Sequence, residues 1–172
     1  MSSVADRYGV ASPRTAQHPR AFTGHEFITG VFWAVLWFQP MGAAITLVIG
    51  LIATPVMALG YTVAAGFVGL PVSIAAALVG SPGAFVFGRA LSAESRDRIH
   101  LVVFAAYGVA VGLVTVVASG LVVGGSPSAV WLLAPYALAA GVAVPLGWWK
   151  ASRGALAAEA EQVAPSRETS AE

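Results

Sequence analysis

The chain has 172 residues, of which 58% are hydrophobic and only 10% are charged, and its formal net charge is +1. Ordinary globular domains carry about 25% charged residues, so this composition is atypical of a water-soluble fold. The absence of cysteine excludes disulfides, thiolate metal ligands and cysteine nucleophiles. Neither tail has the sustained basic charge that nucleic-acid binding requires, so no nucleic-acid partner is expected.

The first 26 residues contain several charges and no apolar segment of the kind found in a signal peptide. They are rich in Ser, Pro, Ala and Arg, a composition typical of chains that bury too little apolar surface to fold. We therefore expect residues 1–26 to form a disordered N-terminal tail.

Two stretches, residues 27–88 and 99–149, contain no Asp, Glu, Lys or Arg. Soluble helices need one wet face, so a soluble domain of this size scatters its charges along the whole chain. A membrane span needs about 20 apolar residues, and each stretch is long enough for two spans and a turn. The sequence therefore predicts an all-α polytopic membrane protein with four transmembrane helices.

The first two predicted helices cover residues 27–52 and 55–80. Thr54 can cap a helix and Pro55 suits its first turn, so the break is expected there. A competing break at Gly60 shifts both bounds by about five residues, within the usual error of such boundaries. Ser81–Pro82–Gly83 is expected to end the second helix.

The next two predicted helices cover residues 95–123 and 129–150. The turn signal between them is the run Gly124–Gly125–Ser126–Pro127–Ser128. Residues 151–172 form the C-terminal tail, which is Ala-rich at first and should begin as a short helix before becoming disordered.

The basic residues near the predicted helices predict the orientation. They lie in the N-terminal tail, in the middle segment and after the fourth helix, whereas the two turns carry no charge. With four spans, the positive-inside rule places both termini in the cytoplasm. The single Lys and absent Asn are typical of a GC-rich bacterium, so the inner membrane is the expected location. Arginines and lysines at this depth can hold anionic lipid headgroups, and the candidates are Arg89, Arg96, Arg98, Lys150 and Arg153.

Small residues form a stripe on each of the two middle helices. Helices in lipid associate by close packing, which favours Gly, Ala, Ser and Thr at the contact. The stripes repeat every three or four residues, which keeps each on one helix face. We expect the two stripes to pack against each other; they consist of Thr62, Gly66, Gly69, Ser73 and Ala77 on the second helix, and Ala105, Gly108, Gly112, Thr115 and Ser119 on the third.

Few polar side chains lie at membrane depth. Gln39 precedes Pro40, and its amide could bond the carbonyl that the proline leaves free, bond another helix, or contact a substrate. Tyr107 and Tyr136 could place a hydroxyl inside the bundle or at an interface. These three residues form the possible polar membrane site.

A cluster of ionisable residues is expected on the cytoplasmic side, including His25, Glu26, Glu94, Asp97 and His100. A His with carboxylates can bind a metal or move a proton. The simpler interpretation is that Glu94 forms a solvated helix pair with Arg98, and that Asp97 stabilises a helix N-terminus. We therefore predict no catalytic residue, no metal and no cofactor.

The sequence supports three functional hypotheses. The first is a non-enzymatic integral membrane protein, acting as a structural or accessory subunit or as a small homo-oligomer assembled through the small-residue faces. The second is a small transporter or channel formed by oligomerisation, or one with a lipid-like substrate. The third, an intramembrane enzyme, lacks the ionisable groups that such chemistry needs. Expected partners are membrane lipids, further copies of the chain or a larger membrane complex.

Overall fold

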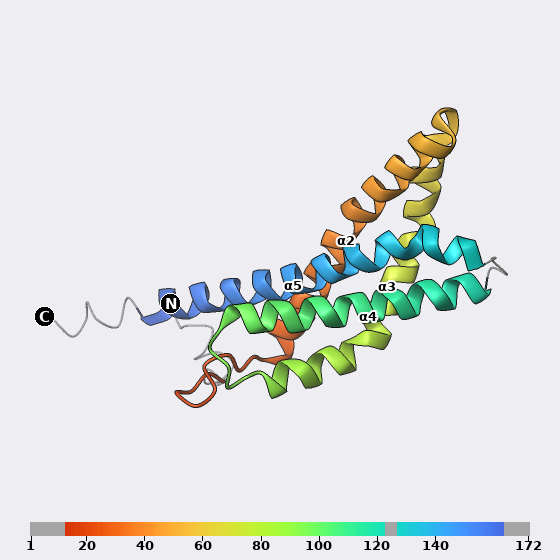
Figure 1. The fold of residues 1–172 in the computed structure, drawn as a ribbon. Coiled ribbons are helices and arrows are strands. Elements are labelled where there is room, and N and C mark those ends of the chain that lie inside the picture. Colours follow the sequence, from red (N-terminus) through yellow and green to blue (C-terminus); the bar gives the residue numbers. More distant parts are fainter. Residues whose placement is uncertain (1–12, 123–126, 164–172) are drawn as a thin grey trace, which may run out of the picture.

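The computed structural model describes residues 13–122 and 127–163. Within them the chain is all-α, as predicted, and forms four long helices (Figure 1). Their bounds are α2 Gly24–Ala53, α3 Ala58–Ala90, α4 Asp97–Val122 and α5 Pro127–Val163, with a short 3₁₀ helix η1, Pro55–Met57, before α3.

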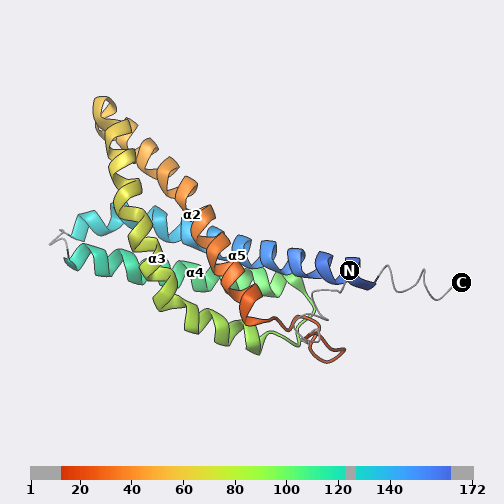
Figure 2. The same ribbon diagram turned by 180° about the vertical axis from the view of Figure 1, so that it is seen from behind.

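The helices form two antiparallel hairpins, α2–α3 and α4–α5. Helices α4 and α5 lie side by side along their length, and α2 crosses α5 (Figures 1 and 2). The two hairpins are close at the end where α2 and α4 begin, but the tip of the α2–α3 hairpin points away from the α4–α5 pair (Figures 1 and 2). Helix α3 meets α4 over only a short length.

The α2–α3 turn lies at Pro55, as the sequence predicts, and not at the alternative Gly60. Pro55 occupies the first turn of η1, where its missing N–H needs no partner. The expected cap by the Thr54 hydroxyl is absent, and the Thr54 backbone N–H instead donates to the Gly50 carbonyl at 2.7 Å. Gly50 allows Ala58 to approach, since a Cβ on Gly50 would lie 3.0 Å from the Ala58 Cα.

The predicted end of the second helix at Ser81–Pro82–Gly83 is wrong, because α3 continues through these residues to Ala90. A proline inside a helix leaves the carbonyl four residues earlier without its donor. Here that carbonyl belongs to Leu78, and the Ser81 hydroxyl donates to it at 3.0 Å. A membrane helix tolerates proline when a neighbouring Ser or Thr satisfies the freed carbonyl, and Ser81 does so.

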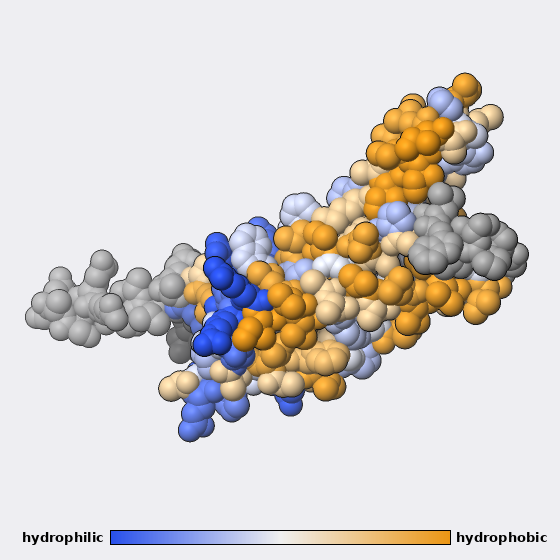
Figure 3. Space-filling view, in the orientation of Figure 1, coloured by the Kyte–Doolittle hydropathy of each residue, from blue (hydrophilic) through white to orange (hydrophobic). Residues whose placement is uncertain are grey.

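Three segments are long and apolar enough to cross a membrane: Gly24–Ala53, Pro55–Ala90 and Asp97–Leu121. This indicates a multi-pass membrane protein. Side chains over most of the visible face are hydrophobic, and hydrophilic ones gather at one end (Figure 3). Helix α5 is not among these three candidates; its described part contains Pro135 and Pro145 and, at Lys150, a charged residue.

Residues 13–23, which we call the N-terminal strap, make specific contacts with the helices, contrary to the expected disordered tail. The strap ends at Thr23, whose side chain caps α2 by accepting from the Glu26 backbone N–H at 3.2 Å. The Arg20 backbone N–H donates to the Ser92 carbonyl at 3.1 Å, in the link between α3 and α4. The other parts of the predicted tails, residues 1–12 and 164–172, lie outside the described residues, as does most of the predicted turn at residues 124–128.

Candidate functional site: a cavity between the two hairpins

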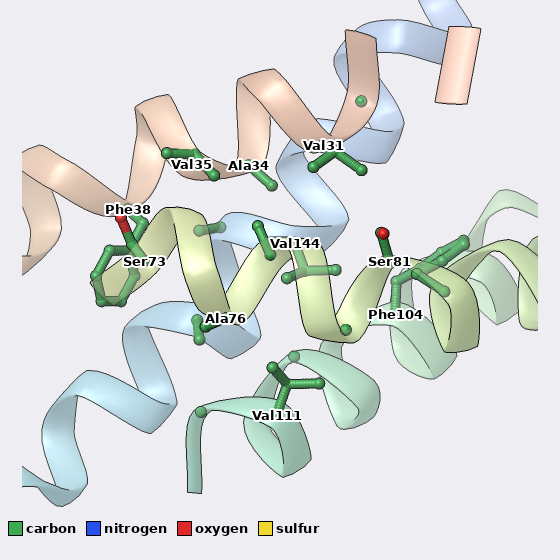
Figure 4. Close-up of a pocket in the computed structure, with 18 of the residues that line it drawn as sticks. Val31, Ala34, Val35, Phe38, Ser73, Ala76, Ser81, Phe104, Val111 and Val144 are labelled. Atoms are coloured by element: carbon green, nitrogen blue, oxygen red, sulfur yellow. The ribbon is translucent and has the colours of Figure 1, made fainter. Parts of the chain in front are cut away.

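A cavity of about 660 Å³ lies between the two hairpins and is lined by residues of all four long helices and the strap. Figure 4 shows side chains from these helices around a common space, with Val31, Val35 and Phe38 from α2, Ser73 and Ala76 from α3, Val111 from α4 and Val144 from α5. Its volume falls in the range of about 300–1,000 Å³ that is usual for small-molecule sites.

The polarity of the lining changes along the cavity. Among the described residues, the charged ones that line it are Arg14, Arg20 and Glu26, all at the end near the strap. The rest of the lining is mainly aliphatic, aromatic or small, with a few hydroxyl and amide groups. The cavity therefore has one ionic end and a long apolar body.

The small-residue stripe of α4 packs on α5, so the predicted contact between the two stripes is wrong. A Cβ on Gly108 would lie 2.5 Å from the Ala140 carbonyl oxygen, and one on Gly112 would lie 2.7 Å from the Ala137 Cα. Both distances are too short for any side chain, so these glycines allow the α4 and α5 backbones to approach closely. Thr115 and Ser119, further along the stripe, line the cavity. Ala105 contacts α5 at Gly141, because a Cβ added to Gly141 would lie 3.3 Å from the Ala105 carbonyl oxygen.

The stripe of α3 faces the cavity instead of another helix. Gly66, Gly69, Ser73 and Ala77 are part of the lining, and a Cβ added to Gly66 or Gly69 would meet nothing within 4 Å. Thr62 lies outside the lining, and its hydroxyl donates to the Ala58 carbonyl at 2.9 Å. The two predicted faces thus border the same space, but only one of them is a packing contact.

The α3–α4 contact occurs at the strap side of the cavity, around Tyr107. The Tyr107 hydroxyl donates to the Gly80 carbonyl and so joins α4 to α3. Gly83 leaves room for the phenol, since a Cβ there would lie 2.5 Å from the Tyr107 oxygen. The sequence singled out Tyr107 for its polarity, and the structure assigns that polarity to a helix–helix bond.

Gln39 joins the two helices of the first hairpin. Its Nε2 donates to the Ser73 Oγ at 2.8 Å, and the Ser73 hydroxyl donates to the Leu70 carbonyl at 2.8 Å. The amide also lies 3.3 Å from the Val35 carbonyl, which is not the Leu36 carbonyl that Pro40 frees. Of the roles considered for Gln39, the one seen in the structure is therefore a hydrogen bond between two helices.

Tyr136 joins α5 to α2. Its hydroxyl lies 2.6 Å from the Thr46 Oγ1, and the Thr46 hydroxyl donates to the Gly42 carbonyl at 2.9 Å. Because the Thr46 proton is used on that carbonyl, the Tyr136 phenol is the donor to Thr46. Gly42 lies against the Tyr136 ring, since a Cβ added to Gly42 would be 3.7 Å from the Tyr136 Cε1 atom. Thr46 was missed by the sequence reasoning, which had no means of pairing it with a residue 90 positions away.

The ionic end of the cavity is built from the strap and three helices. Arg14 pairs with Glu26 of α2 at 2.8 Å and with Glu159 of α5 at 2.5 Å. Arg20 pairs with Asp97 in the first turn of α4. Sequence reasoning missed Arg14, Arg20 and Glu159 as partners because it treated both tails as unstructured.

Three of the five predicted headgroup-binding residues lie over aromatic rings. The Arg89 guanidinium carbon is 5.0 Å from the centre of the Phe85 ring, and Arg153 is 4.6 Å from that of Trp149. Lys150 Nζ is 5.4 Å from the centre of the Trp33 ring. Arg96 and Arg98 are exposed. All five lie near the charged end of the helices.

His100 is buried, with 1% of its surface exposed. Its ring stacks on Trp148 with centroids 4.7 Å apart, and its Nδ1 lies 3.3 Å from the Arg96 carbonyl oxygen. In the described part of the chain, no three His, Asp or Glu side chains come together in a way that could hold a metal ion. His100 therefore contributes to the α4–α5 packing.

Comparison with protein-family models, with curated proteins and with solved structures gives no match to this chain.

Proposed function

We propose that this chain is an integral membrane protein with four spans and both termini in the cytoplasm. Three apolar helices and the gathering of hydrophilic residues at one end support this topology. Helix α5 runs antiparallel to α4 along its length, so a bilayer that contains α4 also surrounds α5. The positive-inside rule then assigns the charged end to the cytoplasm.

Single cysteines test this topology cleanly, because the chain has none of its own. Val56 is 95% exposed in the α2–α3 turn, whereas Ala93 and Ala157 are exposed near the charged end. In intact cells an impermeant thiol reagent should label Val56→Cys, and it should label Ala93→Cys and Ala157→Cys only after the membrane is opened. Labelling of Ala157→Cys in intact cells would show that α5 does not cross.

We further propose that the cavity holds the hydrocarbon part of a lipid-like molecule, and that the protein has no enzymatic activity. The observation that carries this proposal is the cavity of about 660 Å³ with its largely apolar lining. Protein interiors are close-packed, so a space this large within a bilayer favours an apolar occupant. An apolar cavity also disfavours water, which needs polar partners.

This function is the lipid-like form of the transporter hypothesis. A water-filled channel within one copy is not supported, because the body of the cavity is apolar. Four of the polar groups in it, Gln39, Ser73, Thr46 and Tyr136, already bond one another or the backbone. They are therefore more suited to holding the helices together than to guiding an ion.

Filling the cavity tests the proposal. Ala76 lines the cavity on α3, and its neighbour Ala75 is exposed and lies outside the lining. Native mass spectrometry of the protein in mild detergent should show bound lipid for the parent chain and for Ala75→Phe, and at least a tenfold lower occupancy for Ala76→Phe. Equal lipid binding by the two variants would contradict the proposal.

A second candidate function is assembly as a structural or accessory subunit, and one observation favours it. Helix α3 is the least covered of the three candidate spans; Phe67 and Val79, which lie outside the cavity lining, are 80% and 83% exposed. A second copy or another membrane protein can cover such a face as readily as lipid does. Analytical ultracentrifugation in detergent distinguishes these, since a monomer that copurifies with no partner would contradict assembly.

A further inference from the structure

The N-terminal strap forms one wall of the cavity's ionic end. Arg14, Arg20 and Phe22 belong both to the strap and to the cavity lining. The strap reaches every element at this end, since Arg14 pairs with α2 and α5, Arg20 pairs with α4, and the backbone of Arg20 bonds the α3–α4 link at Ser92. The strap therefore borders the ionic end of the cavity.

The two ends of the strap are held by different forces. Near α2, the Phe22 ring packs edge-on against Phe85, with centroids 5.6 Å apart, and lies 6.0 Å from the Phe27 ring. Gly88 makes room for it, since a Cβ there would lie 2.8 Å from the Phe22 ring. This end is an apolar anchor that does not depend on salt.

The rest of the strap is held mainly by ion pairs and a few hydrogen bonds. The Asp97 side chain is 47% exposed and Glu159 is 34% exposed, so water can compete for both. Exposed ion pairs of this kind contribute at most about 1 kcal/mol each. The Arg14–Glu26 pair is more sheltered, since these side chains are only 12% and 19% exposed. The strap has turns but no helix of its own between residues 13 and 23. The strap is thus anchored by ring packing at Phe22 and by a sheltered ion pair at Arg14, and between these points it is held by the exposed Arg20–Asp97 pair.

We propose that the strap is a latch that closes the charged end of the cavity and opens by breaking its ion pairs while Phe22 stays in place. The proposal uses the topology proposed above, which puts the strap in the cytoplasm, but not the identity of the molecule in the cavity. Its test detects access to the cavity wall and needs no ligand. The two failures are distinguishable, because Ala93→Cys, exposed at the strap end, labels in inside-out vesicles only if the topology is right, whatever the latch does.

Access is measured with a single cysteine at Ala84, which lines the cavity on α3. An impermeant thiol reagent is added from the strap side, in inside-out vesicles. Arg20→Asp removes the ion pair and adds repulsion from Asp97, so it should raise the labelling rate of Ala84→Cys about tenfold, equivalent to ~1.4 kcal/mol. Exchanging the charges in Arg20→Asp/Asp97→Arg should return the rate close to that of the parent.

Two controls accompany this experiment. Arg98→Gln changes an exposed arginine next to Asp97 and should leave the rate unchanged. Ala93→Cys, exposed at the same end, should label fast in every background.

Ionic strength gives an independent measurement on the parent latch. At 1 M salt the screening length is about 3 Å, so labelling of Ala84→Cys should accelerate without any substitution of the latch. The latch is refuted if Ala84→Cys labels at the same rate in the parent, in Arg20→Asp and in Arg20→Asp/Asp97→Arg, and if salt does not change that rate. It is also refuted if the exchanged pair stays as fast as Arg20→Asp, because the ion pair would then not be what closes the cavity.

Discussion

The two hairpins carry similar small-residue faces and use them in opposite ways. In the α4–α5 hairpin, Gly108 lies so close to Ala140 that an added Cβ would be 2.5 Å from its carbonyl oxygen. In the α2–α3 hairpin, Gly66 and Gly69 have nothing within 4 Å of an added Cβ. A small-residue face can therefore bring two backbones together or keep a space open between them.

The two small-residue faces differ in packing because the hairpins are joined mainly through α2 and α5. Helix α2 meets α5 tightly at Gly147, where an added Cβ would lie 2.7 Å from the Ala34 backbone nitrogen. This contact holds α2 near α5, while the tip of the hairpin points away (Figure 2). Helix α3 then faces the α4–α5 pair across the cavity, with direct contact confined to the region of Gly80 and Tyr107.

The largest expected effect comes from adding volume to the tight hairpin. Gly112→Leu should lower the free energy of unfolding by about 3 kcal/mol, because overpacking a close helix contact forces the backbones apart. Thermal unfolding in detergent, followed by circular dichroism, measures this loss. A melting temperature equal to that of the parent would contradict the close α4–α5 contact.

The same experiment on the open hairpin should give a change of opposite sign. Gly66→Ala and Gly69→Ala fill empty space and remove a flexible residue from a helix, so each should stabilise the protein by about 0.5–1 kcal/mol. Gly108→Ala is the matched control and should destabilise it. A loss of stability for Gly66→Ala and Gly69→Ala would mean that another helix or chain covers α3 there.

A smaller effect is expected from the bond that joins α3 to α4. Tyr107→Phe removes the hydroxyl that donates to the Gly80 carbonyl. Hydrogen bonds between membrane helices average about 0.6 kcal/mol, so the loss of stability should be of this size. Tyr61→Phe, at a half-exposed tyrosine of α3, should change the melting temperature by less.

The smallest effect should come from the bond within the open hairpin. The coupling between Gln39→Leu and Ser73→Ala in a double-mutant cycle should not exceed about 0.6 kcal/mol. The Gln39 amide has the Val35 carbonyl as a second partner, which reduces the loss. A coupling of several kcal/mol would indicate that this bond, and not the turn at Pro55, holds α2 against α3.

Local chemistry made much of the fold predictable from the sequence. Charge-free stretches identified the apolar helices, and Pro55 identified the turn, since each signal acts within a few residues. The continuation of α3 past Pro82 was missed because a turn signal and a tolerated membrane proline look alike in sequence. The hydroxyl of Ser81 decides between them by satisfying Leu78, and only the structure shows that bond.

The candidate site was predictable only in part. Helical spacing identified the small faces that border the cavity, but spacing does not show which helix they meet or whether they meet one. The strap was missed because its composition is that of a disordered tail. Its contacts with Glu26, Asp97 and Glu159 depend on residues brought together by the folded helices.

The turn at η1 has a consequence for how the protein is made. Val56 and Met57 at this turn are 95% and 59% exposed, and neither they nor their neighbours carry a charge. Moving a charged side chain across hydrocarbon costs about 2.5–3.5 kcal/mol even by insertion scales, whereas apolar residues cross favourably. In the topology proposed above, the α2–α3 turn can therefore cross the hydrocarbon without carrying a charge, while the charged strap stays on the side from which the helices enter.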